Sequence, residues 1–162
     1  RFSNGIGAPI SPGNNCWNLL VNDLVRSLVI NQQFSFNSNP NTPLDIFPIT
    51  LAEKFLVKCI NSGGNLPSKI FNFSMGSSTT LRELSSNISK IFQSITGLKP
   101  EITFPENYEL IDASSQRLHI DNSALLKEFN LRPFNQSTID NEIEQLIEKC
   151  VDWHGINNKF NV

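Results

Sequence analysis

The sequence carries almost no excess of charge, because 13 lysine and arginine residues stand against 15 acidic residues, a formal net charge of −2. It has no block of like charges that could hold a nucleic-acid backbone or an anionic membrane surface. It also lacks an apolar run near the roughly 18 residues that cross a membrane, and its N-terminus lacks the features of a signal peptide. We therefore expect a cytoplasmic protein without nucleic-acid or membrane partners.

Cysteine and histidine are scarce as well. Cys16, Cys59 and Cys150 are odd in number and far apart, which fits neither a disulfide framework nor the paired spacing of a zinc site. We expect three reduced thiols that pack as small apolar groups. His119 and His154 each lack a second histidine or a suitably spaced carboxylate, so the sequence predicts no metal ligand.

Two elements of dinucleotide-dependent catalysis are missing. A dinucleotide site uses a glycine-rich turn between a strand and a helix, whose amides meet the pyrophosphate. The available glycines are either too loosely spaced or placed after a helix. They are Gly5, Gly7, Gly13, Gly63 and Gly64. Tyr108 is the only tyrosine, and Asp112 follows four residues later where a lysine could lower the pKa of the phenol. The sequence therefore predicts no catalytic residue.

What the sequence does contain is helical periodicity. Apolar residues return at helical spacing in five segments, 18–31, 51–60, 80–95, 121–129 and 137–150. The third segment is the clearest, because Thr80 and Glu83 have the spacing of a capping box and Gly97 is placed to end the helix. Asp121 and Ser137 are predicted to cap the last two helices.

Short strand candidates alternate with these helices. They are residues 1–3, 44–49, 69–73, 101–104 and 117–120. The segment 69–73 is followed by a turn and then by the best helix of the chain, which is a strand, loop and helix unit. No internal repeat and no glycine- or proline-rich linker divides the sequence, so residues 1–162 are expected to form one α/β unit.

Taken in order, four segments resemble one known family. RFSNGIGAP at 1–9 is similar to an Arg-x-x-Asn-x-x-Gly strand and loop, and TPLDIFPITLAE at 42–53 to a strand followed by a helix start. Residues 70–84 are similar to a Phe-Asn-x-Gly-x-Gly … Ser-Leu-x-Glu-Leu segment, and residues 121–133 to an Asp-x-Ser-Lys … Gly-Trp-x-Pro ending. Together they resemble the C-terminal half of the extended short-chain dehydrogenase/reductases, the NAD-dependent nucleotide-sugar epimerase and dehydratase family.

The resemblance implies an α/β fold that is the C-terminal substrate-binding part of such an enzyme. Residues 1–4 and 69–73 would be neighbouring parallel edge strands of a Rossmann-like sheet, with the helix that begins near Leu51 packed across them. The other strands, the NAD or NADP site and the catalytic pair would come from an N-terminal Rossmann half absent from this sequence. The implied partners are that half and a nucleotide-diphosphate sugar, with a homodimer left open, and this chain alone would bind no cofactor.

The resemblance also assigns five candidate substrate-binding residues, each with a simpler alternative. Asn4 would bind substrate phosphate, or serve only as a strand-end asparagine. Asn18, followed by Leu19, would lie where a helix N-terminus faces the diphosphate, or act as a plain N-cap. Phe36 would lie near the nucleotide base, or pack in the core. Arg117 would supply a cation for the diphosphate, or be an ordinary solvated arginine.

The sequence departs from the family pattern at two informative positions. Leu44 stands where the family has a diphosphate-binding arginine, which removes a charge-assisted contact. One residue is missing between Thr50 and Leu51, where the pattern expects an aspartate to cap a helix, and Thr50 is predicted to replace it. Two functions follow: the substrate-binding part of an NAD(P)-dependent epimerase, dehydratase or reductase, or a non-catalytic binding or interaction domain that kept the fold and lost the clamp.

Overall fold

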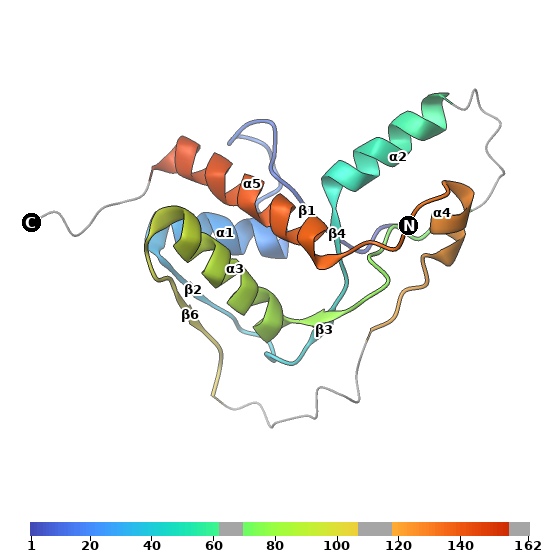
Figure 1. Ribbon diagram of the computed structural model, residues 1–162. Coiled ribbons are helices and arrows are strands. Elements are labelled where there is room, and N and C mark those ends of the chain that lie inside the picture. Colours follow the sequence, from blue (N-terminus) through green and yellow to red (C-terminus); the bar gives the residue numbers. More distant parts are fainter. Residues whose placement is uncertain (62–69, 107–117, 156–162) are drawn as a thin grey trace, which may run out of the picture.

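The computed structural model of the chain describes residues 1–61, 70–106 and 118–155 (Figure 1). Helices and short strands alternate along it. In chain order they are β1 (Asn4–Ile6), α1 (Leu20–Asn31), β2 (Gln33–Ser35), β3 (Pro43–Leu44), β4 (Ile46–Pro48), α2 (Ile49–Asn61), β5 (Thr79–Thr80), α3 (Leu81–Thr96), β6 (Glu101–Thr103), α4 (Ser123–Glu128) and α5 (Gln136–His154). Over these ranges, none of the helices combines the length and apolarity that crossing a membrane requires.

Each of the five predicted helical segments is a helix, and the predicted capping box is confirmed. The Glu83 N–H donates to Thr80 Oγ1 at 3.1 Å, and the Thr80 N–H donates to Glu83 Oε2 at 2.8 Å. Gly97 ends α3 in the left-handed region at φ 73°, which a glycine adopts at little cost. Local sequence signals therefore predict both ends of α3 to within one residue.

The cap predicted for the last helix is wrong, and the one predicted for α4 is confirmed only in part. Asn135, not Ser137, is the N-cap of α5, and its Oδ1 accepts from the Thr138 N–H and from the Ser137 hydroxyl. The N-cap of α4 is Asn122, whose side chain makes no capping bond. Asp121, one residue earlier, still accepts the Ser123 N–H at 2.9 Å, and this hydrogen bond lowers the pKa of the Asp121 carboxyl.

The N-terminal segment and the segment ending at Phe73 are parallel neighbours, as predicted. The Phe73 N–H donates to the Arg1 carbonyl at 2.7 Å, and the Ser3 N–H donates to the Phe73 carbonyl at 3.0 Å. The pairing is a single bridge between Phe2 and Phe73, not two regular strands. The regular strand β1 begins only at Asn4 and pairs in parallel with β4, and Lys69 lies outside the described residues.

Two further strand pairs complete the α/β arrangement. β2 pairs in parallel with β6, and β3 pairs antiparallel with β5. β2 was not expected, because three residues are too few for an alternating pattern to stand out. The strand predicted at 117–120 is wrong for residues 118–120, which form no strand, and Arg117 lies outside the described residues.

Figure 1 shows α1, α3 and α5 grouped together, with α2 projecting away from them. α5 packs against both α1 and α3, and it buries Ile143, Leu146 and Ile147 completely. α2 contacts the Phe73 segment, because the ring centroid of Phe55 lies 5.4 Å from that of Phe73. These contacts form one continuous core. Packing of this helix across the N-terminal segment as well stays a prediction.

The buried carboxylate of Asp45 joins three distant segments. Its Oδ2 accepts the Ser74 hydroxyl at 2.6 Å, and its Oδ1 accepts the Met75 N–H at 3.2 Å. Its backbone carbonyl accepts both the N–H and the side-chain amide of Asn4, at 3.2 and 3.1 Å. A buried carboxylate is stable only when its oxygens are hydrogen-bonded, so these donors fix the join between β3 and β4 against the N-terminal segment and the loop after Phe73.

A second buried carboxylate joins α5 to α2. Glu142 is 3% exposed, and its Oε2 accepts the Thr50 hydroxyl at 2.5 Å. α2 begins at Ile49, so Thr50 lies inside the helix and the prediction that it caps the helix is wrong. No acidic residue stands in the first turn of α2. Glu142 therefore supplies, from another helix, an acidic side chain that accepts a hydrogen bond in the first turn of α2.

The Asp45 contacts lead to a stability prediction. Ser74→Ala removes the donor to Oδ2 and leaves a buried carboxylate oxygen without that partner. We expect the free energy of unfolding, measured by urea denaturation, to fall by about 2 kcal/mol. Ser77→Ala, at an exposed position of the same turn, should change it by less than about 0.5 kcal/mol. Equal effects of the two substitutions would show that the Asp45 contacts add no stability.

The Glu142 environment leads to a pH prediction. Burial raises the pKa of the Glu142 carboxyl above its usual 4.5, against the opposing effects of Thr50, Lys54 and Lys149. The folded state therefore binds this proton more tightly than the unfolded state, so this group's stabilising contribution falls as the pH rises above about 4.5. Glu142→Gln should flatten this part of the pH dependence of the urea midpoint. The exposed control Glu144→Gln should retain it, and an unchanged profile in Glu142→Gln would contradict the assignment.

Candidate substrate-binding surface

Asn4 is exposed at the start of β1, and it has a clear structural role. Its backbone N–H and its side-chain Nδ2 both donate to the carbonyl oxygen of Asp45. The strand-end role considered for this residue is therefore confirmed, and a role toward substrate phosphate stays a prediction. The same side chain could serve both through the second hydrogen of its Nδ2, because the amide nitrogen carries two donors and Oδ1 only accepts.

The loop after β1 is tied to the start of α1. Asn22, fully buried in the first turn of α1, donates its Nδ2 to the Gly7 carbonyl at 2.9 Å. Gly7 has no room for a side chain, because an added Cβ would lie 2.0 Å from Ile49 Cγ2. Since Gly7 is three residues beyond Asn4, this contact brings the end of β1 close to the N-terminus of α1.

The N-terminus of α1 lacks a side-chain cap. Leu19 is the N-cap in an extended conformation, and it makes no side-chain hydrogen bond to the helix. The alternative in which Asn18 is the N-cap is therefore wrong, and Asn18 lies exposed one residue earlier. Leu19 is 43% exposed. The partial positive charge of this helix end thus lies beside two exposed residues that the family resemblance assigns to the diphosphate.

Phe36 lies inside the molecule. Its side chain is 6% exposed and stacks on Phe104 with a centroid distance of 4.7 Å. Its backbone N–H donates to the Thr103 carbonyl at 2.9 Å. The packing role is therefore confirmed, and contact between Phe36 and a nucleotide base stays a prediction.

The predicted site also includes two positions, 117 and 44, that were considered for a cation. Arg117 lies outside the described residues. Leu44, where the family has an arginine, is half-buried in β3 and pairs with Thr79. Arg82 was not singled out from the sequence, yet its guanidinium lies 5.3 Å from the ring centroid of Phe104. Nothing in the sequence around Arg82 predicts a contact with Phe104, because the two residues are far apart in the chain.

The cysteines have the character predicted for them. All three are reduced thiols, and Cys150 is fully buried while Cys16 and Cys59 are half-buried. Burial raises the pKa of the Cys150 thiol to about 12, so it stays protonated at neutral pH. Within residues 1–61, 70–106 and 118–155, no three histidine, cysteine or acidic side chains come together as a metal site.

Comparison with known proteins gave matches among solved structures alone. No family model matches the chain, and no curated protein matches its sequence. A UDP-N-acetylglucosamine 4-epimerase from Methanobrevibacter ruminantium, solved with UDP-N-acetylmuramic acid, matches with a TM-score of 0.66 at 13% identity, over 94% of this chain and 45% of its own. A UDP-glucuronic acid 4-epimerase from Bacillus cereus, solved with UDP-glucuronic acid and NAD, matches with a TM-score of 0.66 at 11% identity, over 94% and 44%.

A third match is an NAD-dependent NDP-hexosamine 5,6-dehydratase of tunicamycin biosynthesis, with a TM-score of 0.59 at 19% identity, over 91% of this chain and 43% of its own. The chain thus spans less than half the length of each of these proteins. Identities this low report on the fold. This chain has the fold of the C-terminal half of the extended short-chain dehydrogenase/reductases, the fold shared by NAD-dependent sugar epimerases and dehydratases.

Proposed function

We propose that the chain is the nucleotide-sugar-binding part of an NAD(P)-dependent epimerase or dehydratase. The observation that carries this proposal is the match of more than nine-tenths of the chain to half of such enzymes, including two solved with bound UDP-sugars. A fold by itself hosts many functions, so the proposal rests equally on the surface at the start of α1.

That surface suits an anion. The uncapped N-terminus of α1 offers backbone amides and a partial positive charge, which favour a diphosphate. Asn18 and Leu19 flank it, and the Asn22 bond to Gly7 holds it near Asn4. Arg117 would add the cation that Leu44 does not supply. The nucleoside diphosphate would therefore lie between Asn4 and the start of α1.

The cofactor and the catalytic groups would come from a separate N-terminal half. The sequence has no glycine-rich strand-to-helix turn that would fit a dinucleotide, so no residue of this chain is assigned to NAD(P). When bound to that half, NAD(P) would supply hydride exchange. This chain would bind and orient the sugar nucleotide.

The docking surface for that half would run along the N-terminal segment and one side of α2. Phe2 is 57% exposed, and it bridges to Phe73 on one side. Ile49, Leu56 and Ile60 are 49%, 55% and 76% exposed and recur on one side of α2. Exposed apolar side chains that lie close together indicate an interaction surface. A further parallel strand with its own helix would cover both Phe2 and the apolar side of α2.

A second function is favoured by one observation. Leu44 is half-buried in a strand pair at the position of the family's diphosphate arginine, so the strongest expected contact with the substrate is gone. A non-catalytic domain that kept the fold would tolerate this change. The sequence preceding Arg1 in the parent gene separates the two functions, because the enzyme requires a Gly-x-x-Gly-x-x-Gly turn and a Tyr-x-x-x-Lys pair there.

Nucleoside diphosphate binding tests the anion surface. Uridine, thymidine, guanosine and cytidine diphosphates are titrated by calorimetry, and at least one should bind weakly. Arg117→Ala should weaken that binding by about one to two decades, since a charge-assisted hydrogen bond contributes about 1.5–3 kcal/mol. Arg132→Ala, at an exposed position near α4, should change it little. Equal losses would indicate general electrostatics, and no binding even with the N-terminal half restored would favour the non-catalytic domain.

Cofactor binding tests the division of labour between the two halves. The purified chain should show no saturable, tight NAD binding in calorimetry and no epimerase or dehydratase activity. Adding the N-terminal half in trans, or fusing it upstream of Arg1, should restore both. Tight NAD binding by the chain alone would place a cofactor site where the sequence predicts none.

A further inference from the structure

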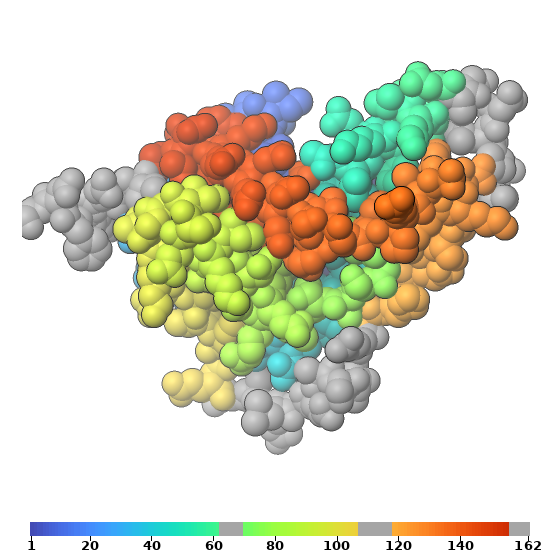
Figure 2. Space-filling model, viewed as in Figure 1, coloured from blue at the N-terminus to red at the C-terminus, as the bar shows by residue number. Residues whose placement is uncertain are grey.

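An open groove runs between α3 and the segment 100–104, which contains β6. Figure 2 shows the surfaces of these two parts side by side, α3 in yellow-green and the segment in yellow. The groove has a volume of about 370 Å³, and Pro100, Ile102 and Phe104 form its apolar side. This volume lies within the range of about 300–1,000 Å³ that is usual for small-molecule sites.

α3 forms the polar side of the groove with two cations and three hydroxyls. They belong to Arg82, Ser85, Ser86, Ser89 and Lys90. Positions 82, 86, 89 and 90 follow the i, i+4, i+7, i+8 spacing of one helix face. The two cations are eight residues apart, which is about 12 Å along the helix axis. Because helical side chains lean toward the N-terminus, Lys90 can reach the serines that lie between the two cations.

An aromatic stack positions the guanidinium of Arg82. This group lies 5.3 Å from the ring centroid of Phe104, and Phe104 stacks on the buried Phe36 with a centroid distance of 4.7 Å. Since Phe36 belongs to the core, the stack fixes the ring on which Arg82 rests. A cation–π contact does not require the five N–H donors of the guanidinium, so Arg82 can still bind an anion through them.

No carboxylate balances these two cations inside the groove. None of the described residues that line it is acidic. Glu83, which follows Arg82, accepts the Thr80 N–H in the capping box at the start of α3. Glu101 directly precedes Ile102 in β6, so the two side chains point to opposite faces of the strand. The lining therefore carries two positive charges and no negative one.

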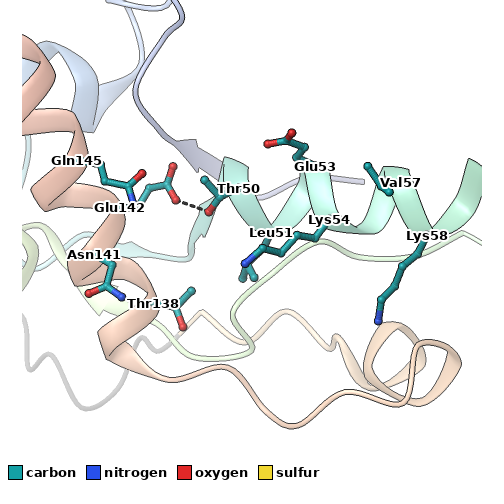
Figure 3. Close-up of a pocket in the computed structure, with 10 residues that line it drawn as sticks. All are labelled: Thr50, Leu51, Glu53, Lys54, Val57, Lys58, Thr138, Asn141, Glu142 and Gln145. Carbon is teal, nitrogen blue, oxygen red and sulfur yellow. Dashed lines mark hydrogen bonds between the residues drawn. The ribbon is translucent and has the colours of Figure 1, made fainter.

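The larger groove between α2 and α5 lacks this excess of positive charge. Figure 3 shows Lys54 and Lys58 on α2, together with Glu53 on the same helix and Glu142 on α5. Two acidic residues accompany the two basic ones, so an anion would gain no net electrostatic attraction there. Of these two grooves, the one beside α3 has the lining that favours an anion.

We propose that the groove between α3 and β6 binds a small organic phosphate, namely a phosphomonoester with an apolar carbon skeleton. The phosphate lies between Arg82 and Lys90, because both side chains form charge-assisted hydrogen bonds with phosphate oxygens. The hydroxyls of Ser86 and Ser89 donate to the same oxygens. The carbon skeleton lies against the apolar side of the groove at Ile102.

This site shares no lining residue with the proposed nucleotide-sugar surface. That surface lies at Asn4 and the start of α1, whereas the groove is lined by α3 and the segment 100–104. The groove also lies outside the exposed apolar side of α2. The proposal therefore does not rest on the proposed enzyme function.

The test is an NMR titration of the purified, ¹⁵N-labelled chain. Phenyl phosphate is the probe, and phenol and inorganic phosphate are added separately as controls. Saturable shifts are expected for the amides of Ser86, Ser89 and Ile102, with phenyl phosphate bound at least about fivefold more tightly than inorganic phosphate. Lys90→Gln should weaken this binding about tenfold, whereas the matched Lys127→Gln, at an exposed position of α4, should stay within about twofold.

Any of three results contradicts the proposal. These are the absence of saturable shifts at millimolar phenyl phosphate, equal affinity for phenyl phosphate and inorganic phosphate, and equal losses in the Lys90 and Lys127 variants. An unchanged spectrum away from α3 and β6 checks that Lys90→Gln is folded. Nucleoside diphosphate binding that shifts amides at the start of α1 and persists in Lys90→Gln keeps a failure of this groove distinct from a failure of the proposed function.

Discussion

The buried carboxylate of Asp45 is the constraint on which the rest of the structure depends. Its side chain holds the loop that follows Phe73, and its carbonyl holds Asn4, so segments separated by 29 and 41 residues meet at one point. Burying this charge without its donors would cost several kcal/mol, which leaves the chain one way to bring these segments together. The parallel order of the N-terminal segment, β4 and the Phe73 segment follows from it.

α5 extends this constraint to the helices. Its apolar side packs on α1 and α3, and its Glu142 reaches the first turn of α2. The direction of α2 is thereby fixed at its N-terminal end, while its C-terminal turns lean outward (Figure 1). One side of α2 is left apolar and exposed, and the proposed docking surface includes it. That surface thus depends in part on how one carboxylate from α5 positions a neighbouring helix.

The fold and the chemistry of the site depend on different numbers of residues. The core rests on many apolar positions that tolerate exchange when burial is kept, which explains a TM-score of 0.66 at 11% identity. A diphosphate clamp rests on one arginine, and here that position is Leu44. Structural similarity therefore shows the fold, and it does not decide whether a nucleotide sugar binds.

The sequence by itself determined the elements whose signals are local. Five helices follow from apolar spacing, and the ends of α3 follow from Thr80, Glu83 and Gly97, because a helix cap involves only neighbouring residues. The parallel contact of Phe2 with Phe73 was reached only through the family resemblance. Within the candidate site, Asn4 and the start of α1 were located in the same way.

Only the tertiary structure decided the contacts between residues far apart in the chain. Glu142 supplies the acidic group of α2 from 92 residues away, and no local pattern predicts such a substitution for a missing aspartate. Phe36 is buried because Phe104 stacks on it, and β2 forms because β6 lies beside it. In each case the partner is brought into place by packing, which a single sequence does not encode as a readable spacing.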